Sequence, residues 1–194
     1  NIPIALTWGA ADLIPFDHDL YVGTFGTHGN RHANFAVQNA DLIISLGSRL
    51  DTKSTGSPIN TFAREAKKIM VDIDINELNK FQYFDLKFDQ LIHCDLRDFF
   101  NNFSKLEPTK DTSNNLEWLK QINKWKHQFI SFDDTKGIAT TKVNPYNFVD
   151  SISNNLKGNE QIFIDTGCSI AWFMQSLRVK DKVRVFHDFN NTAM

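Results

Sequence analysis

The chain has 194 residues, a net charge of −2, and 41% hydrophobic and 23% charged residues, a composition typical of a soluble globular protein with one or two domains. No basic block favours nucleic acid or an anionic membrane, and no apolar run approaches the roughly 20 residues of a membrane helix, so we expect neither partner. Cys94 and Cys168 form no Cys-x-x-Cys pair and suit a reducing compartment, which favours a cytoplasmic protein.

The first part of the chain predicts a strand, a glycine loop, a helix and a buried strand. Residues 2–6 are a short apolar run of strand type. Glycines at positions 23, 26 and 29 predict a tight loop, and no apolar strand leads into Gly23. Residues 30–39 have helical apolar spacing, and residues 42–46 are an apolar run that ends at Gly47. This order is half of a βαβ nucleotide-handling unit.

The next part continues the alternation of strands and helices. A polar loop follows Gly47, and residues 61–67 predict a short helix. Residues 69–74 predict a second buried strand, and residues 89–93 lead into a helix over 96–103 with Asp95 as its N-cap. A linker composition follows from residue 104.

The last part begins with an amphipathic helix that carries a stripe of core-type residues: Leu116, Leu119, Ile122, Trp125 and Phe129. Asn144 and Pro145 predict a helix start. A strand over 162–165, a helix over 169–177 and a strand over 183–186 follow. Because strands and helices alternate without hairpin signals, we expect an α/β fold with a mainly parallel, Rossmann-like sheet and flanking helices. From the sequence, we expect both ends of the chain to be truncated.

Several polar residues suggest chemistry, and each has a plainer explanation. His28 and His32 are four residues apart, but Gly29 stands where a zinc hydrolase needs Glu, so we expect no metal site. Asp72 and Asp74 end a buried strand, where a carboxylate either accepts a ribose hydroxyl or caps the next turn.

Two further groups are candidates for binding an anion. Arg49 and Lys53 follow Gly47 and pair either with phosphate or with surface acids. Cys168 stands at a strand-to-helix turn, where a helix N-terminus would lower a thiol pKa, yet no His nearby in sequence could act as its base. Backbone N–H groups and the Ser169 hydroxyl at this turn favour an anion instead.

An ordered set of motifs resembles a known family. The motifs are Gly26-Thr27-His28-Gly29, Ala33-Asn34, Ala40-Asp41-Leu42, Gly47-Ser48-Arg49, Thr55-Gly56, Phe62-Ala63, Ala66-Lys67 and Val71-Asp72-Ile73-Asp74. They resemble the middle domain of thiamine-diphosphate-dependent enzymes, above all the acetolactate synthase branch, over about residues 2–103, and Glu77 and Lys80 extend the match.

The remainder resembles the start of the same family's C-terminal domain. Asp165-Thr166-Gly167 looks like its first strand exit, which implies that Cys168 and Ser169 approach the cofactor diphosphate, although acetolactate synthases usually have Gln-His there. Met194 takes the position of the residue that wedges the cofactor into its bent form. The resemblance divides the chain into a middle domain (1–105), a linker with an amphipathic helix (106–140) and an incomplete second α/β domain (141–194).

The resemblance also implies an activity and its cofactors. Pyruvate loses carbon dioxide on thiamine diphosphate and is joined to a second 2-keto acid, giving 2-acetolactate, in a homo-oligomer that holds Mg²⁺ through a Gly-Asp-Gly…Asn segment. That segment and the family's activating Glu are not found in these 194 residues, so we expect no catalytic residue or metal ligand here and no activity from this chain alone. In this branch FAD binds the middle domain, and the matching positions are Gly26, Thr27, His28, Gly29, Gly47, Ser48, Arg49, Asp72 and Ile73.

Other hypotheses about the ligand and the function stay open. Many relatives keep the middle-domain fold without the flavin, and an earlier glycine-rich flavin contact would precede Asn1. The parent could act on another 2-keto acid in sugar or cell-surface metabolism, or the chain could be a non-catalytic nucleotide-binding module.

Overall fold

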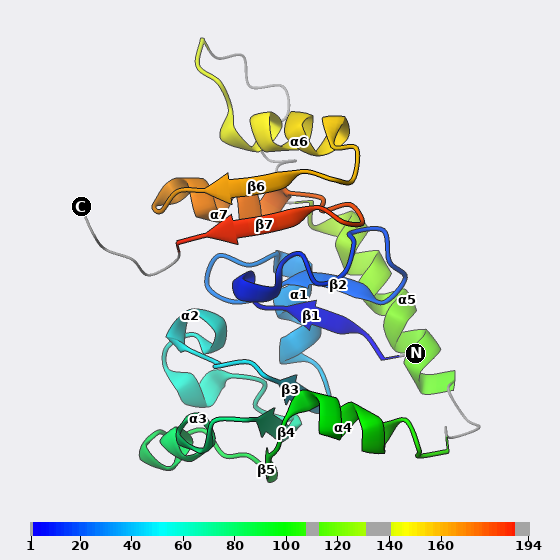
Figure 1. Cartoon of the computed structure of the whole chain (residues 1–194), viewed down its shortest axis with the longest axis vertical. Helices are drawn as coiled ribbons and strands as arrows, with labels where there is room; N and C mark the ends of the chain where they lie inside the picture. The colour runs from blue at the N-terminus through cyan, green and yellow to red at the C-terminus, as the bar shows by residue number, and fades with distance from the viewer. Residues whose placement is uncertain (1, 108–112, 131–140, 189–194) are drawn as a thin grey trace.

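Parallel strands with helices between them build the protein, whose computed structural model describes residues 2–107, 113–130 and 141–188 (Figure 1). The strands are β1 (Ile4–Leu6), β2 (Tyr21–Thr24), β3 (Leu42–Leu46), β4 (Lys67–Asp72), β5 (Gln90–His93), β6 (Gln161–Ile164) and β7 (Arg184–His187). β1 pairs with β2, β6 pairs with β7, and the three middle strands form a sheet in the order β3-β4-β5. Every strand pair in these ranges is parallel, which confirms the predicted α/β class.

The helices are α1 (Arg31–Gln38), α2 (Thr52–Thr55), α3 (Ile75–Asn79), α4 (Leu96–Phe103), α5 (Ser113–Gln128), α6 (Pro145–Asn155) and α7 (Cys168–Ser176). Several of them, α2, α3, α4 and α6, begin at a side-chain cap. Asp95 accepts a hydrogen bond from the Arg97 amide at 2.7 Å, and Asn144 accepts one from the Tyr146 amide at 2.9 Å. Both predicted N-caps are therefore confirmed, because their side chains satisfy amides that lack partners within the helix.

Two local predictions were wrong. Gly23 lies inside strand β2, which is buried along its whole length, so the glycine loop starts only after Thr24. The signal was weak because β2 has four residues and contains a glycine. The helix expected over 61–67 is also absent: a 3₁₀ turn covers Ile59–Thr61, and Lys67 already belongs to β4.

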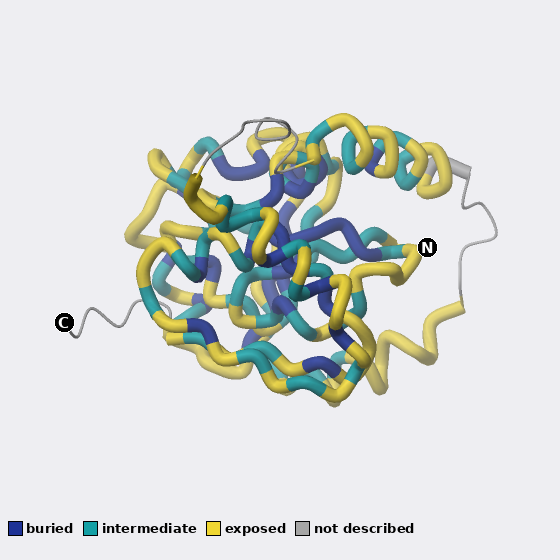
Figure 2. Tube along the Cα trace, turned by 90° about the horizontal axis from the view of Figure 1, so that it is seen from above, coloured by how far each residue is buried: buried dark blue, intermediate teal, exposed yellow. Residues whose placement is uncertain are grey.

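The main core lies between the first five strands and their helices, and helix α5 contributes to it. Ile122 of α5 is 2% exposed and belongs to the same buried cluster as Met70 of β4. The Phe129 ring stacks on Phe35 of α1 with 5.1 Å between centroids. Leu116, which the stripe also placed in the core, is 46% exposed. The buried positions run through the centre of the molecule in Figure 2, with exposed positions around them.

The β6–β7 unit packs against the start of the chain. Ile164, Ile170 and Met174 form a buried cluster with Ala11, from the segment between β1 and β2. Asp12 of the same segment accepts a hydrogen bond from the Val185 amide at 2.9 Å. Among the described residues, no helix is both long enough and apolar enough to cross a bilayer.

Candidate functional site

A cavity of about 180 Å³ opens where strands β1, β2 and β3 end. Its lining comes from the three segments that leave these strands: Thr7, Trp8, Gly9, Phe25, His28, Ser48, Arg49, Leu50, Asp51, Lys53 and Ser54. The carboxyl ends of parallel strands are where α/β folds bind their ligands. This cavity, called the nucleotide pocket below, is therefore the candidate site.

The segment after β1 gives the pocket its aromatic wall. Trp8 stacks with His28, with 6.0 Å between ring centroids and an interplanar angle of 29°. A Cβ built on Gly9 would meet nothing within 4 Å, so this wall is open beside the rings. Flat aromatic rings at an open wall suit stacking against a planar ligand group.

The loop 25–29 is fixed by hydrogen bonds to its own helix and to α2. The Asn34 side chain accepts a bond from the Gly26 amide at 2.8 Å and donates one to the Gly26 carbonyl at 2.9 Å. The Thr27 amide donates to the Lys53 carbonyl at 2.7 Å. A Cβ on Gly26 would lie 2.4 Å from that carbonyl oxygen, and one on Gly29 would lie 2.5 Å from the Phe25 carbonyl carbon. These glycines are therefore needed for packing within the protein itself.

The loop after β3 forms the floor of the pocket. Leu50 is 3% exposed and has φ of 47°, a left-handed conformation that bulky residues seldom adopt. Asp51 caps α2 by accepting a hydrogen bond from the Ser54 amide at 2.9 Å. The Ser48 Oγ is buried and has no hydrogen-bond partner among the described residues. A buried polar atom without a partner is costly, and a bound polar ligand would satisfy it.

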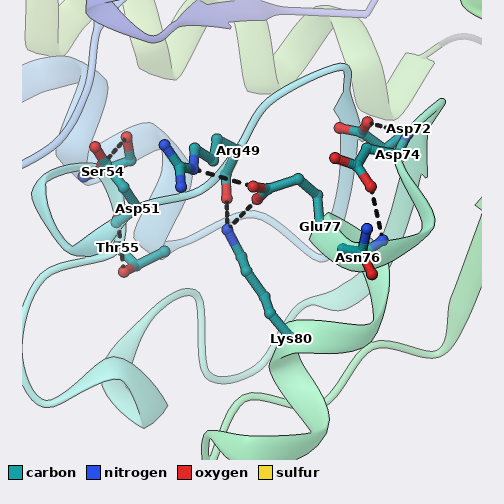
Figure 3. A network of polar contacts seen from close by, with 9 residues as sticks. All are labelled: Arg49, Asp51, Ser54, Thr55, Asp72, Asp74, Asn76, Glu77 and Lys80. Carbon is teal, nitrogen blue, oxygen red and sulfur yellow. Dashed lines mark hydrogen bonds and ion pairs between the residues drawn. The ribbon is translucent and has the colours of Figure 1, made fainter.

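A polar network ties this loop to helix α3 (Figure 3). Arg49 Nε lies 3.1 Å from Glu77, and Lys80 Nζ lies 2.6 Å from the same carboxylate while also donating to the Arg49 carbonyl. Of the two roles that the sequence left open for Arg49, pairing with an acid is the one observed. Its side chain remains 78% exposed.

Asp72 and Asp74 serve the turn after β4. Asp72 is buried and accepts a hydrogen bond from the Asp74 amide at 2.9 Å, while Asp74 accepts one from the Asn76 amide at 2.8 Å and caps α3. Ile73 is 65% exposed. Neither Asp72 nor Ile73 lines the nucleotide pocket, so the capping role that the sequence left open for the aspartates is the one observed.

Three of the nine nucleotide positions expected from the sequence line the pocket: His28, Ser48 and Arg49. Gly26, Thr27, Gly29 and Gly47 lie in the same two loops but are not part of the lining. Sequence reasoning missed the wall formed by Thr7, Trp8 and Gly9. The wall depends on the pairing of β1 with β2, which no local sequence pattern indicates.

A second candidate site lies at the start of α7, nine residues long, which follows β6 as the sequence predicts. Cys168 is exposed, and the Ser169 hydroxyl donates to the Asp165 carbonyl at 2.8 Å. A Cβ on Gly167, whose φ is 91°, would meet nothing within 4 Å. Gly167 is the N-cap of α7 and makes no side-chain cap hydrogen bond, and the first amides of a helix are a common place for an anion to bind. Met194 lies outside the described residues.

His28 and His32 lie in different surroundings. His28 lines the nucleotide pocket, whereas His32 lies on α1 near Lys126 of α5, and burial, assisted by that cation, lowers the pKa of His32 to about 4. Among the described residues, no group of three or more His, Cys, Asp or Glu side chains could hold a metal ion.

Comparison with known proteins identifies relatives of this arrangement. Residues 1–101 match the family model described as thiamine pyrophosphate enzyme, central domain. The chain is 30% identical over 185 residues to the acetolactate synthase large subunit of Pyropia yezoensis, covering 94% of this chain and 30% of that protein. It is 32% identical over 187 residues to the probable acetolactate synthase large subunit of Methanocaldococcus jannaschii, covering 93% of this chain and 30% of the relative. An 80-residue stretch is 42% identical to acetolactate synthase isozyme 2 large subunit of Escherichia coli (strain K12), covering 41% of this chain and 14% of that protein. The chain thus spans less than a third of these curated relatives.

Proposed function

The chain belongs to the thiamine pyrophosphate enzyme family, and from this membership we propose that it is part of an acetolactate synthase-like carboligase. Such an enzyme decarboxylates pyruvate and joins the remaining two-carbon unit to a second 2-keto acid, which gives 2-acetolactate and carbon dioxide. One observation carries the proposal. The similarity to acetolactate synthase large subunits covers 93% and 94% of the chain, well past the central-domain match that ends at residue 101.

We propose that the nucleotide pocket holds part of FAD or of a related nucleotide. The Ser48 Oγ, which has no partner among the described residues, and the cation Lys53 fit the phosphate of such a ligand, and the stacked rings of Trp8 and His28 fit its ring. A cavity of about 180 Å³ is smaller than the roughly 300–1,000 Å³ of complete ligand sites. It therefore suits one portion of the molecule, such as its diphosphate.

The start of α7 is our proposed site for the diphosphate of thiamine diphosphate. When bound, this cofactor supplies the electron sink for decarboxylation. The protein's own part here would be to hold an anion with the backbone amides of Cys168 and Ser169, which belong to the first turn of α7, and Gly167 adds no side chain beside them. Met194 remains a proposed contact to the cofactor, and Mg²⁺, a homo-oligomer and a cytoplasmic location remain proposals that rest on the family.

The activity is tested by product analysis. We expect the full-length protein that contains this chain to convert pyruvate alone into 2-acetolactate in the presence of thiamine diphosphate and Mg²⁺. The 194-residue chain should release no carbon dioxide, because the family's activating Glu and Gly-Asp-Gly segment are not in it. Detecting no acetolactate from the full-length protein would reject the leading proposal, and turnover by the 194 residues would refute the expected inactivity.

The pocket is tested by a pair of lysine variants. Lys53 is exposed and lines the pocket, whereas Lys67, at the start of β4, is also exposed and does not line it. Because a charge-assisted hydrogen bond contributes about 1.5–3 kcal/mol, we expect Lys53→Ala to weaken FAD binding about tenfold or more and to reduce its salt dependence. Flavin fluorescence titrations measure both. An equal loss in Lys67→Ala would show that the effect is nonspecific and would refute the pocket.

The residues at the start of α7 support a second candidate function. Cys168 and Ser169 stand where acetolactate synthases usually have Gln-His, which favours a relative that acts on a different 2-keto acid. A non-catalytic nucleotide-binding module is a third candidate. Product analysis separates the first two, and the presence of the activating Glu and the Gly-Asp-Gly segment in the full-length protein would exclude the third.

A further inference from the structure

The last turn of α7 is capped by Thr24 and Asn30, the two residues that flank the loop 25–29. The final carbonyl groups of a helix have no partners within it and must be satisfied from elsewhere. The Thr24 hydroxyl donates to the Met174 carbonyl at 3.0 Å, and the Asn30 side-chain amide donates to the Gln175 carbonyl at 2.9 Å. Each of these two bonds joins residues about 150 positions apart in sequence, and together they connect the end of β2 and the start of α1 to helix α7.

Thr24 and Asn30 also close the base of the loop 25–29. The Asn30 amide donates to the Thr24 carbonyl at 2.7 Å, and the Thr24 amide donates to Asn30 Oδ1 at 2.9 Å. Thr24 is 3% exposed and Asn30 is 7% exposed, so water does not compete for these bonds. The side chains of Thr24 and Asn30 therefore hold both the loop 25–29 and the C-terminal end of α7.

Trp8 makes a second connection between the nucleotide pocket and helix α7. Its ring lines the nucleotide pocket beside His28, and it packs against the buried cluster that includes Ile170 and Met174 of α7. His187 Nε2 of β7 lies 3.1 Å from the Trp8 carbonyl oxygen. Movement of the pocket wall and movement of α7 are thus linked by packing as well as by hydrogen bonds.

We propose that occupancy of the nucleotide pocket and docking of α7 are energetically coupled, with Thr24 and Asn30 as the positioning residues of this coupling. The inference rests on the nucleotide pocket proposed above. A ligand that orders the loop 25–29 also orders its base, and the base holds the carbonyl end of α7. The opposite end of this nine-residue helix carries Cys168 and Ser169, the proposed diphosphate contacts. By reciprocity, a diphosphate bound at the start of α7 tightens binding in the pocket by the same factor.

Two asparagines of the same loop region give a matched test. Asn30→Asp keeps the acceptor for the Thr24 amide but sets a carboxylate against the Gln175 carbonyl. Asn34→Asp makes the same chemical change against the Gly26 carbonyl and leaves the bond to Gln175 in place. In ligand-free protein, hydrogen–deuterium exchange of the α7 amides should rise at least tenfold in Asn30→Asp, which loses the direct bond to Gln175, and should rise less in Asn34→Asp, which acts on α7 only through the loop. Thr24→Val, which keeps the shape and loses the bond to Met174, should raise it as well.

A second arm uses FAD as the probe. In the wild-type protein FAD should slow exchange in both the loop 25–29 and α7, whereas in Asn30→Asp it should protect the loop alone. If wild-type protein fails to bind FAD, the proposed pocket ligand is wrong, and the ligand-free comparison still decides whether Thr24 and Asn30 link the loop to α7, the link without which there is no coupling. Equal α7 exchange in Asn30→Asp, Asn34→Asp and wild type would overturn the coupling.

Discussion

Gly26→Ala is expected to lower the free energy of unfolding by about 3 kcal/mol and to weaken nucleotide binding at least tenfold. Two costs add. Gly26 has φ of 115°, which an L-residue adopts only with a strain of about 1–2 kcal/mol. The new methyl group would also lie 2.4 Å from the Lys53 carbonyl oxygen, and relieving such overpacking costs about 1–3 kcal/mol. The relief moves the loop away from α2 and breaks the bond from the Thr27 amide to that carbonyl.

Gly56→Ala separates these two costs. Gly56 also has a positive φ, 81°, with ψ of −176°, yet a Cβ there would meet nothing within 4 Å. We expect this variant to lose only the strain, about 1–2 kcal/mol, and to keep nucleotide affinity. Urea unfolding measures the stabilities, and flavin fluorescence measures the affinities. Equal losses in the two variants would contradict the steric part of the explanation.

Acid should destabilise the protein through His32. The pKa of this buried imidazole, about 4, lies below its ordinary value of 6.5, so the unfolded chain binds the proton more readily than the folded protein. Stability that is fully present above pH 6.5 is therefore lost as the pH falls, and the loss is complete near pH 4. A difference of this size corresponds to about 3 kcal/mol.

The physical cause lies between α1, β2 and α5. Burial is the largest contribution, and Lys126, which donates to the Tyr21 carbonyl at 2.9 Å, adds a like charge nearby. His32→Gln removes the titration, so the stability difference between wild type and variant should shrink by about 3 kcal/mol from pH 7 to pH 4. Urea unfolding at both pH values, with the variant subtracted, removes the contribution of every other group. A difference that does not change with pH would refute the role of His32.

Short-range patterns were enough to predict most elements. Strand β3 and helix α4 have the predicted bounds, since an uninterrupted apolar run and an Asp cap are local signals. Strand β2 was missed because the buried run around Gly23 is too short to show periodicity. The helix predicted over 61–67 failed because residues Lys67 and Lys68 pair with β3, and tertiary pairing overrode the local spacing.

The site was predictable only where local motifs define it. His28, Ser48 and Arg49 follow glycine signals at the ends of β2 and β3, and all three line the pocket. The wall at Trp8 depends on β1 lying beside β2, and no local pattern carries that information. The bond from Asn30 to Gln175 likewise joins residues 145 positions apart. Such contacts follow from topology, which short-range spacing does not encode.

The place of α5 in the core has a practical consequence for expressing the first unit alone. A boundary at residue 105 would remove Ile122, together with the partly buried rings of Trp118 and Trp125 that pack on the same cluster. The truncated product would then present an uncovered apolar strip along α1, the kind of surface that drives aggregation. A soluble truncation should end after Ile130, where the helix has already covered that face.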